Sequence, residues 1–409
     1  PQERAAARQI LERHGRSALD YFKLWPDKSY FFSASQDCFV AYRVDANTAV
    51  ALGDPVGPPE QVGRAISEFR EYCEGNGWSL AWHQTLPDFL PLYRRAGFRK
   101  LKIGDDAIVD LTAFSLEGRR MRRFRQRVGQ LEKAGVRWRQ YPAPLPDELI
   151  PRLQEVSDEW LRLPGKRERA FTLGRFMPDY LRTTPVVTAE DAGGRILAFV
   201  NLIASYHAGE ATIDLMRHRW QAPNGVMDYL FIKVFLICRE QGFTRFNLGM
   251  APMDGFRERE EAAASERAVH TFFQHLNFLF SFSGLKQYKA KFADSWEPRY
   301  MVYRSVLDLP KLGLALSRVT EIDARELRLS QAEQTVRAAF AETAAAAESV
   351  APPTALPAPG SRPTQGGASL SDRCTLGEVP RPAAAGPIRR RDGWTLVNYM
   401  ARRKQAPLS

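Results

Sequence analysis

The stretch APNGVMDYLFIKVFLICREQGFTRFNLGMAP, residues 222–252, decides the fold of this chain. Its side chains are apolar almost without interruption from Val226 to Ile237, which predicts a helix that is buried on nearly all sides. The segment TRFNLGM that follows alternates apolar and polar side chains, which indicates a strand with one face in the core. Asp228 at the front of the helix and Asn247 in the strand are polar residues in an apolar setting, so both are candidate site residues.

Two interpretations of Asp228 are open. Asn224 is a suitable N-cap, and a carboxylate in the first helical turn is stabilised by the helix dipole, typically by about 0.3–1 kcal/mol. Alternatively, the front end of so buried a helix faces an internal cleft, where a carboxylate can pair with an ammonium group.

The strand ATIDLMR, residues 211–217, carries two further candidates. Strict alternation places Asp214 and Arg217 on opposite faces of the strand. They can share a site only across a β-bulge or at the end of the strand, and bulges are over-represented next to active sites. The alternative is a solvated Asp214 and an Arg217 that is an ordinary cation at the entry to a loop.

The strand after the buried helix adds an amide, and a segment further along the chain adds a cluster of lysines. Asn247 points away from the apolar row of its strand, and the neighbouring Gly249 lets backbone or ligand approach closely. The segment GLKQYKAKF contains Lys286, Tyr288 and Lys289. A lysine there can bind a phosphate or a carboxylate as a point charge, or it can simply be solvated.

Residues 118–140 form the most basic part of the sequence, with nine Arg or Lys against one acid, Glu132. Apolar residues recur at helical spacing, so we expect an amphipathic helix with a cationic outer face that binds phosphates. The alternative is a face that is merely solvated. The residues expected to make these phosphate contacts are Arg119, Arg120, Arg122, Arg123 and Arg127.

One order of elements occurs in both halves of the chain: three antiparallel-type strands, a helix, a strand, a helix and a last strand. The predicted helices include residues 5–25 and 269–280. This order is that of the GNAT-type acyltransferase fold, so we expect an α+β protein with tandem GNAT-type folds, as two mixed β-sheets flanked by helices. The expected parts are a first GNAT-like domain with the basic linker helix (1–134), a second, catalytic GNAT-like domain (135–328) and a disordered Ala/Pro-rich tail (329–409).

Composition narrows the class of protein. The 409 residues carry a net charge of +11, which favours polyanionic partners such as nucleic acid or an anionic membrane surface. No window of about 18 apolar residues is free of charge, so we expect no membrane span in this chain. The four cysteines lack metal-ligand spacing, which indicates a reducing, cytosolic environment and no metal site. The chain begins with Pro1, and we expect it to be a piece of a longer protein.

Absent motifs narrow the chemistry. A GNAT-type fold that binds acetyl-coenzyme A usually carries a glycine-rich pyrophosphate loop, but the corresponding segment here is HRWQAPNG, residues 218–225. A P-loop, a nucleophile elbow and an HExxH motif are also absent from the sequence. We therefore expect no coenzyme A and no other cofactor.

Several motifs together resemble a known family. They are LGDPVG (52–57), AIVDLTAFSLEG (107–118), FTLGRF (171–176), IDLMRHR (213–219), APNGVMDYLF (222–231), FNLGMAP (246–252) and YKAKFADSWEPRY (288–300). In this order they resemble the catalytic region of the phosphatidylglycerol aminoacyltransferases, the lysyl- or alanyl-phosphatidylglycerol synthases of the multiple peptide resistance factor family. The resemblance covers residues 18–303.

The resemblance implies an enzyme that moves an aminoacyl group from aminoacyl-tRNA to the glycerol hydroxyl of phosphatidylglycerol. The product is a cationic lipid associated with resistance to antimicrobial peptides. The resemblance also implies that the enzyme acts at the cytoplasmic face of the cell membrane, because family members commonly carry an N-terminal multi-span membrane domain. The transfer would be direct, without an enzyme-bound intermediate.

The resemblance also suggests roles for the candidate substrate-binding residues. Asp214 and Asp228 would surround the ammonium group of the aminoacyl donor, and Asn247 would orient it. Lys286 and Tyr288 would contribute further contacts to substrate.

The candidate catalytic residues are Arg217, Lys289 and Arg299. One or more of them would hold the lipid phosphate or stabilise the oxyanion that develops on the ester carbonyl. The residue that accepts the hydroxyl proton is left open.

Two functions from other classes compete with this interpretation. The first is a tandem GNAT-type, aminoacyl-tRNA-dependent transferase whose acceptor is a peptide or protein amine. The second is a non-catalytic module that binds tRNA or anionic lipid, since a fold can persist without its chemistry.

Overall fold

Two stretches of the chain are described by the computed structural model, residues 2–252 and 284–322. The helix expected at residues 269–280 and the tail expected at residues 329–409 lie outside the described residues. Within the described part, no helix is both long and apolar enough to cross a membrane.

The first half of the chain supplies five strands and the helices around them. In chain order these elements are α1 (Gln2–His14), η1 (Ala18–Leu24), β1 (Ser29–Phe32), β2 (Phe39–Asp45), β3 (Thr48–Leu52), α2 (Pro59–Gly75), β4 (Ser79–Thr85), α3 (Leu90–Arg95) and β5 (Arg99–Asp110). The single helix expected at residues 5–25 is instead split into α1 and the short 3-10 helix η1. The split follows from Ser17, whose hydroxyl accepts a hydrogen bond from the backbone N–H of Leu19 and starts the second helix.

The second half repeats this plan with additional helices. Its elements are α4 (Arg122–Lys133), β6 (Arg137–Tyr141), α5 (Leu149–Leu161), α6 (Pro178–Arg182), β7 (Val186–Glu190), β8 (Ile196–Ala204), β9 (Glu210–His218), α7 (Val226–Glu240), β10 (Arg245–Pro252), α9 (Leu285–Ala290), β11 (Ser295–Tyr303), η2 (Val306–Asp308) and α10 (Leu309–Thr320). The buried helix and the strand after it were predicted from residues 222–252, and they appear as α7 and β10.

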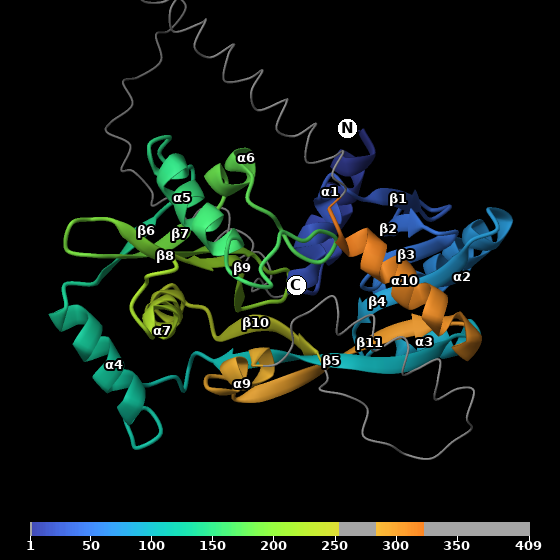
Figure 1. The fold of residues 1–409 in the computed structure, drawn as a ribbon. Helices are drawn as coiled ribbons and strands as arrows, with labels where there is room; N and C mark the ends of the chain where they lie inside the picture. Colours follow the sequence, from blue (N-terminus) through green and yellow to red (C-terminus); the bar gives the residue numbers. More distant parts are fainter. Residues whose placement is uncertain (1, 253–283, 323–409) are drawn as a thin grey trace, which may run out of the picture. The chain divides into compact units, whose positions relative to one another are not determined.

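The strands of both halves join in one eleven-stranded sheet, in the order β1-β2-β3-β4-β11-β5-β10-β9-β8-β7-β6 (Figure 1). The last strand of each half is exchanged, because β11 lies beside β4 and β5 lies beside β10. On either side of the central β5–β11 pair, β4, β3, β2 and β1 correspond to β10, β9, β8 and β7. The tandem α+β arrangement is therefore present, but antiparallel pairing of β5 with β11 fuses the two expected sheets into one.

Helices cover both faces of this sheet. One face carries a core to which η1, α5, α6 and α10 contribute, and we refer to it as the η1 face. On the opposite face, α2 and α3 cover the first half, whereas α4 and α7 cover the second half, and we refer to this side as the α7 face. Figure 1 shows α5 and α7 on opposite sides of the strands β7 to β9. Paired strands separate the two faces except beyond Thr212 and Asn247, where β9 and β10 are no longer paired.

Candidate active site

A β-bulge in β9 shapes the first part of the site. Val200 of β8 is opposite Met216 and Leu202 is opposite Ile213, so two residues of β9 face the single residue Asn201. The side-chain oxygen of Asn201 accepts a hydrogen bond of 2.8 Å from the backbone N–H of the extra residue Leu215.

This bulge breaks the strict alternation of faces in β9. Leu215 packs into the core of the η1 face, while Met216 packs on the α7 face. Asp214 and Arg217 both contact helices of the η1 face, because Asp214 bonds to Tyr180 of α6 and Arg217 stacks on Trp160 of α5. Of the two arrangements that would let these residues share a site, a bulge or the end of the strand, the structure has the bulge.

Asp214 is a buried carboxylate with defined donors. It accepts hydrogen bonds from the Tyr180 hydroxyl at 2.5 Å and from the Gly174 backbone N–H at 2.9 Å. Burial raises the pKa of Asp214 to about 6, and the bonds from Tyr180 and Gly174 and the charge of Arg217 act in the opposite direction. A Cβ atom at residue 174 would lie 1.9 Å from the Asp214 carboxylate, so only glycine allows this approach.

Arg217 lies beside Asp214 with part of its guanidinium unpaired. Its side chain is 4% exposed, forms an ion pair of 2.7 Å with Glu168 and stacks 3.8 Å above the ring of Trp160. Nε and Nη1 have no hydrogen-bond partner among the described residues. Because buried donors are normally bonded, these two N–H groups are available for an anionic or carbonyl oxygen of a ligand.

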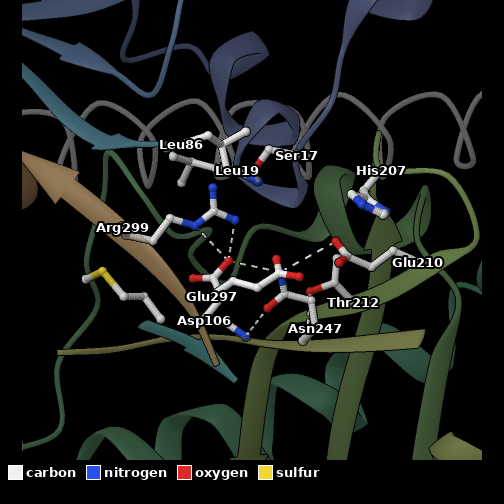
Figure 2. Close-up of polar contacts among 12 residues, drawn as sticks. Ser17, Leu19, Leu86, Asp106, His207, Glu210, Thr212, Asn247, Glu297 and Arg299 are labelled. Carbon is white, nitrogen blue, oxygen red and sulfur yellow. Dashed lines mark hydrogen bonds and ion pairs between the residues drawn. The ribbon is translucent and has the colours of Figure 1, made fainter. Parts of the chain in front are cut away.

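A second polar cluster lies on the η1 face where β5, β10 and β11 meet (Figure 2). The carboxylate of Asp106 accepts hydrogen bonds from Asn247 at 3.0 Å and from Nε of Arg299 at 3.0 Å, with a further short bond from Nη2. Thr212 donates to the backbone carbonyl of Asn247, and Glu210 lies 3.5 Å from the Asn247 amide. Burial raises the pKa of Glu210, while its ion pair with Arg245 acts in the opposite direction.

Lys289 of α9 reaches the edge of this second cluster. Its ammonium group donates to the backbone carbonyl of Met250 at 2.9 Å, and its side chain is buried. Burial lowers the pKa of Lys289 to about 8, although the charge of Asp106 opposes this change. Met250 follows Gly249, where β10 is irregular against β5 and the backbone has a φ of 79°. The irregularity places an accepting carbonyl next to Lys289.

Asp228 has contacts different from those of the two clusters. Asp228 belongs to α7, and its carboxylate lies 3.4 Å from Lys291 on the α7 face. Asp214 instead accepts from Tyr180 of α6, and none of the described residues bonds to both carboxylates, so a shared ammonium site stays a prediction. The expected cap is also different, because Gly225 and not Asn224 occupies the N-cap position of α7.

The remaining two candidates, Tyr288 and Lys286, belong to α9. Tyr288 has its pKa raised by burial and by the neighbouring Asp228 carboxylate. Lys286 is exposed on the first turn of α9. Neither residue contacts the clusters around Asp214 and Asp106 through any hydrogen bond found among the described residues.

The basic segment forms α4 and the turn before it. Met121, Val128 and Leu131 are buried, and the helix packs on α7, as the amphipathic pattern predicted. The side chains that face outward are Arg119, Arg120, Arg122 and Arg123, all exposed. Arg127 is half-buried and donates to the backbone carbonyl of Asn224 at 2.9 Å, so it also fixes the loop before α7.

The sequence analysis missed several residues that complete these clusters. Asp106 stands in an alternating strand, where its place opposite the apolar row could have drawn attention. Glu168 lies in a loop without any periodic signal, and Tyr180 belongs to a helix of one turn. Their positions depend on contacts between distant parts of the chain.

Comparison with known proteins gives the same assignment of the fold. A family described as "Phosphatidylglycerol lysyltransferase, C-terminal" matches residues 8–303. The phosphatidylglycerol lysyltransferase of Bacillus subtilis (strain 168) is 35% identical over 302 residues, which are 74% of this chain and 35% of that protein. That of Staphylococcus aureus (strain MRSA252) is 32% identical over 296 residues, 72% of this chain and 35% of that protein. The chain thus spans about a third of the length of these curated relatives.

Solved structures agree with this result. The structure of L-PGS from Bacillus licheniformis superposes with a TM-score of 0.70 at 33% identity, over 77% of this chain and 95% of that chain. A C-terminal DUF2156 domain from Agrobacterium fabrum gives a TM-score of 0.70 at 34% identity, over 78% of this chain and 97% of that chain. The sequence match, the shared fold and the site motifs in their expected order identify this chain as a member of the phosphatidylglycerol lysyltransferase C-terminal family.

Proposed function

We propose that this chain is an aminoacyltransferase that moves an aminoacyl group from aminoacyl-tRNA to the glycerol hydroxyl of phosphatidylglycerol. The observation that carries the proposal is the bulge in β9, which places a buried carboxylate, Asp214, and a partly unpaired guanidinium, Arg217, on one face of the sheet. The substrate has the complementary groups, an ammonium and an ester carbonyl on adjacent atoms. Membership of the family supplies the acceptor, because the relatives are named phosphatidylglycerol lysyltransferases.

The reaction is a transesterification that needs no added energy source. The lipid hydroxyl oxygen attacks the ester carbonyl carbon, the new ester bond forms, and the bond from that carbon to the ribose oxygen of tRNA breaks. The hydroxyl proton ends on the departing ribose oxygen. Holding both substrates in place can supply roughly 7–11 kcal/mol of the barrier, so positioning is the main task of the protein.

Asp214 and Arg217 have distinct roles in this mechanism. Asp214 pairs with the ammonium group of the donor, and with a pKa of about 6 its carboxyl is ionised at neutral pH. The unpaired N–H groups of Arg217 stabilise the negative charge that develops on the carbonyl oxygen, in a buried site where such donors act most strongly. Glu168 and Trp160 hold the guanidinium in position.

The second cluster serves the acceptor in this proposal. Arg299 is fixed by Asp106, which also accepts from Asn247, so the three side chains form one rigid group. We assign Arg299 and Lys289 to the phosphate of the lipid. Asn247 then contributes by holding Asp106 rather than by touching the ammonium. Asp228 stands outside this mechanism.

The exposed arginines of α4 and of the turn before it are the proposed contacts to the large substrates. Arg119, Arg120, Arg122 and Arg123 present a cationic surface for the tRNA acceptor end or for anionic lipid, at the cytoplasmic face of the membrane. Lysine is the first donor to test, because the relatives are named lysyltransferases, and alanine is the second.

The deciding experiment incubates the chain with tRNA charged with radiolabelled lysine or alanine and with phosphatidylglycerol vesicles. Label is then followed into the lipid by thin-layer chromatography, with vesicles of phosphatidylcholine and hydrolysed aminoacyl-tRNA as controls. Label in phosphatidylglycerol alone supports the proposal and names the amino acid. Label in an added peptide but not in lipid would replace it with the peptide-acceptor function.

A further inference from the structure

Asn201 is a buried amide between the β9 bulge and the tyrosine that bonds to Asp214. It lies in β8, and its side chain has no exposure to solvent. Its side-chain oxygen accepts a hydrogen bond of 2.8 Å from the backbone N–H of Leu215. Its side-chain nitrogen donates to the hydroxyl of Tyr180 at 2.9 Å and to that of Thr184 at 3.2 Å. One amide thus connects the backbone of the bulge to the ring that reaches Asp214.

The chemistry of these groups determines the direction of each bond. The backbone N–H of Leu215 can only donate, so the oxygen of the Asn201 amide faces it and the NH2 group faces Tyr180. An NH2 group can only donate, so the Tyr180 oxygen accepts, and its single proton is directed to Asp214. Burial raises the pKa of Tyr180 well above its usual value, so the hydroxyl keeps this proton. The chain of bonds therefore presents a donor to Asp214.

This direction favours the ionised form of Asp214. One carboxylate oxygen receives the hydroxyl of Tyr180 and the other receives the backbone N–H of Gly174, so an added proton would meet a donor at either oxygen. A hydroxyl that itself receives an N–H bond is also a stronger donor, because bonds in a chain polarise one another. The ionised carboxylate is the form that can pair with an ammonium group.

We propose that Asn201 is a positioning residue for the transfer reaction, which holds the Tyr180 hydroxyl as a donor to Asp214 and at the same time holds the β9 bulge. The contact of Asp214 with the donor ammonium rests on the proposed function, whereas the direction of the hydrogen bonds does not. Among the described residues, the side chain of Asn201 bonds to Leu215, Tyr180 and Thr184, so it acts on Asp214 through Tyr180.

Other charged and titratable groups also face Asp214, from several elements packed around it. They are Tyr21 of η1, Arg217 of β9 and Glu168 of the loop between α5 and α6, in addition to Tyr180 of α6. A neutral substitution at residue 201 changes none of these groups. A change in the pKa of Asp214 after such a substitution therefore reports on the bond from Tyr180.

The first experiment measures the pKa of Asp214 without substrate, by carboxyl NMR titration of a chain with isotope-labelled aspartate, in which Asp214→Asn assigns the signal. We expect Tyr180→Phe to raise this pKa by about one unit, the usual value of a hydrogen bond to a charged group. Asn201→Leu should raise it by up to the same amount. The double variant should match Tyr180→Phe alone, because both substitutions remove the same donor. Additive shifts in the double variant would overturn the inference.

Thr184→Val is the matched control. Thr184 is also buried and accepts from the same amide, but its hydroxyl donates to the backbone carbonyl of Leu181 and not to Asp214. This variant should lose stability and keep both the pKa of Asp214 and the turnover per folded molecule. A pKa rise as large as that of Asn201→Leu would assign the effect to loosened packing and overturn the inference.

A second measurement needs no variant, in case circular dichroism shows that Asn201→Leu does not fold. Neutron diffraction from deuterated crystals of the wild-type chain locates the deuterium of each hydroxyl and amide, which otherwise has to be inferred. The deuterium of Tyr180 should point to Asp214, and two should lie on the Asn201 nitrogen. A Tyr180 deuterium that points to Asn201 would overturn the inference.

The transfer assay distinguishes this inference from the proposed function. In Asn201→Leu, the acidic limb of kcat/KM for aminoacyl-tRNA against pH should move to higher pH by as much as the pKa of Asp214 rises. Wild-type transfer to lipid together with an acidic limb that does not move in Asn201→Leu would keep the function and reject the positioning role. The expected pKa changes in a chain that transfers nothing to lipid would keep the bond chain from Asn201 to Asp214 and reject the function.

Discussion

Asp54, just after β3 in the first half, and Asp214, in β9 of the second half, occupy similar surroundings in corresponding parts of the repeat. Each carboxyl accepts from a buried tyrosine hydroxyl and from a backbone N–H, and burial raises the pKa of each to about 6. The strands differ, because β3 pairs with β2 in regular register while β9 carries a bulge opposite β8. The repeated fold thus reproduces the buried acid twice. The bulge adds an arginine of the same strand beside Asp214, whereas the arginine 3.7 Å from Asp54 is Arg16, which precedes η1.

Removal of Arg217 should have the largest effect on the difference between the two halves. Arg217→Gln is expected to lower the transfer rate by about 100- to 1,000-fold, the usual effect of losing an oxyanion donor. Arg219→Gln is the matched variant on the same segment, because Arg219 is fully engaged by Glu155, Glu159 and the Ile196 carbonyl. That variant should lose stability and keep its turnover per folded molecule. Equal turnover losses in both variants would remove the special role of Arg217.

A single methyl group next to Asp214 should have the next largest effect. The Cβ of Gly174→Ala would lie 1.9 Å from the Asp214 carboxylate and 2.9 Å from Trp25, so the acid must move. We expect transfer to fall by about 10- to 100-fold, since a shift of about 1 Å can cost that much. Gly129→Ala on α4, where a Cβ meets nothing within 4 Å, is the control and should keep full activity. Normal rates in Gly174→Ala would mean that the site tolerates a displaced Asp214.

The pH dependence of stability tests whether the surroundings of Asp54 and Asp214 are alike. The pKa of Asp54 and of Asp214 rises from 3.8 in the unfolded reference to about 6 in the folded protein. Between these values the unfolded state binds fewer protons, so each group makes the free energy of unfolding fall as pH rises through this window, by up to about 3 kcal/mol. In urea unfolding between pH 4 and 7, the free energy of unfolding should fall less with rising pH in Asp54→Asn than in the wild type, and likewise less in Asp214→Asn. A smaller fall in one variant alone would show that the surroundings of the two acids differ.

The smallest effect is expected from the basic surface. Replacing Arg119, Arg120, Arg122 and Arg123 with Gln should weaken aminoacyl-tRNA or vesicle binding and reduce the slope of log K against log salt by up to about 3. The control replaces four exposed arginines of the first half, which are Arg64, Arg94, Arg95 and Arg99. Identical salt slopes in both sets would assign the binding to net charge alone.

Local patterns allowed much of this structure to be predicted. The apolar run of α7, the alternation in β10 and the amphipathic period of α4 depend on neighbours within a few residues, and all three elements are present. The sequence also indicated that Asp214 and Arg217 can meet only across a bulge or at the end of the strand, because side chains alternate between faces. The helix expected at residues 5–25 was wrong, because its capping serine lies in the middle of the pattern.

The sequence by itself determined the repeated order of elements, the buried helix and the cationic helix, since periodicity and charge are local properties of the chain. The tertiary structure alone decided that β5 and β11 change places and that Tyr180 and Glu168 join Asp214 and Arg217. Strand pairing and contacts between residues far apart in the sequence have no local signature, because they depend on which distant segments bury their surfaces against each other.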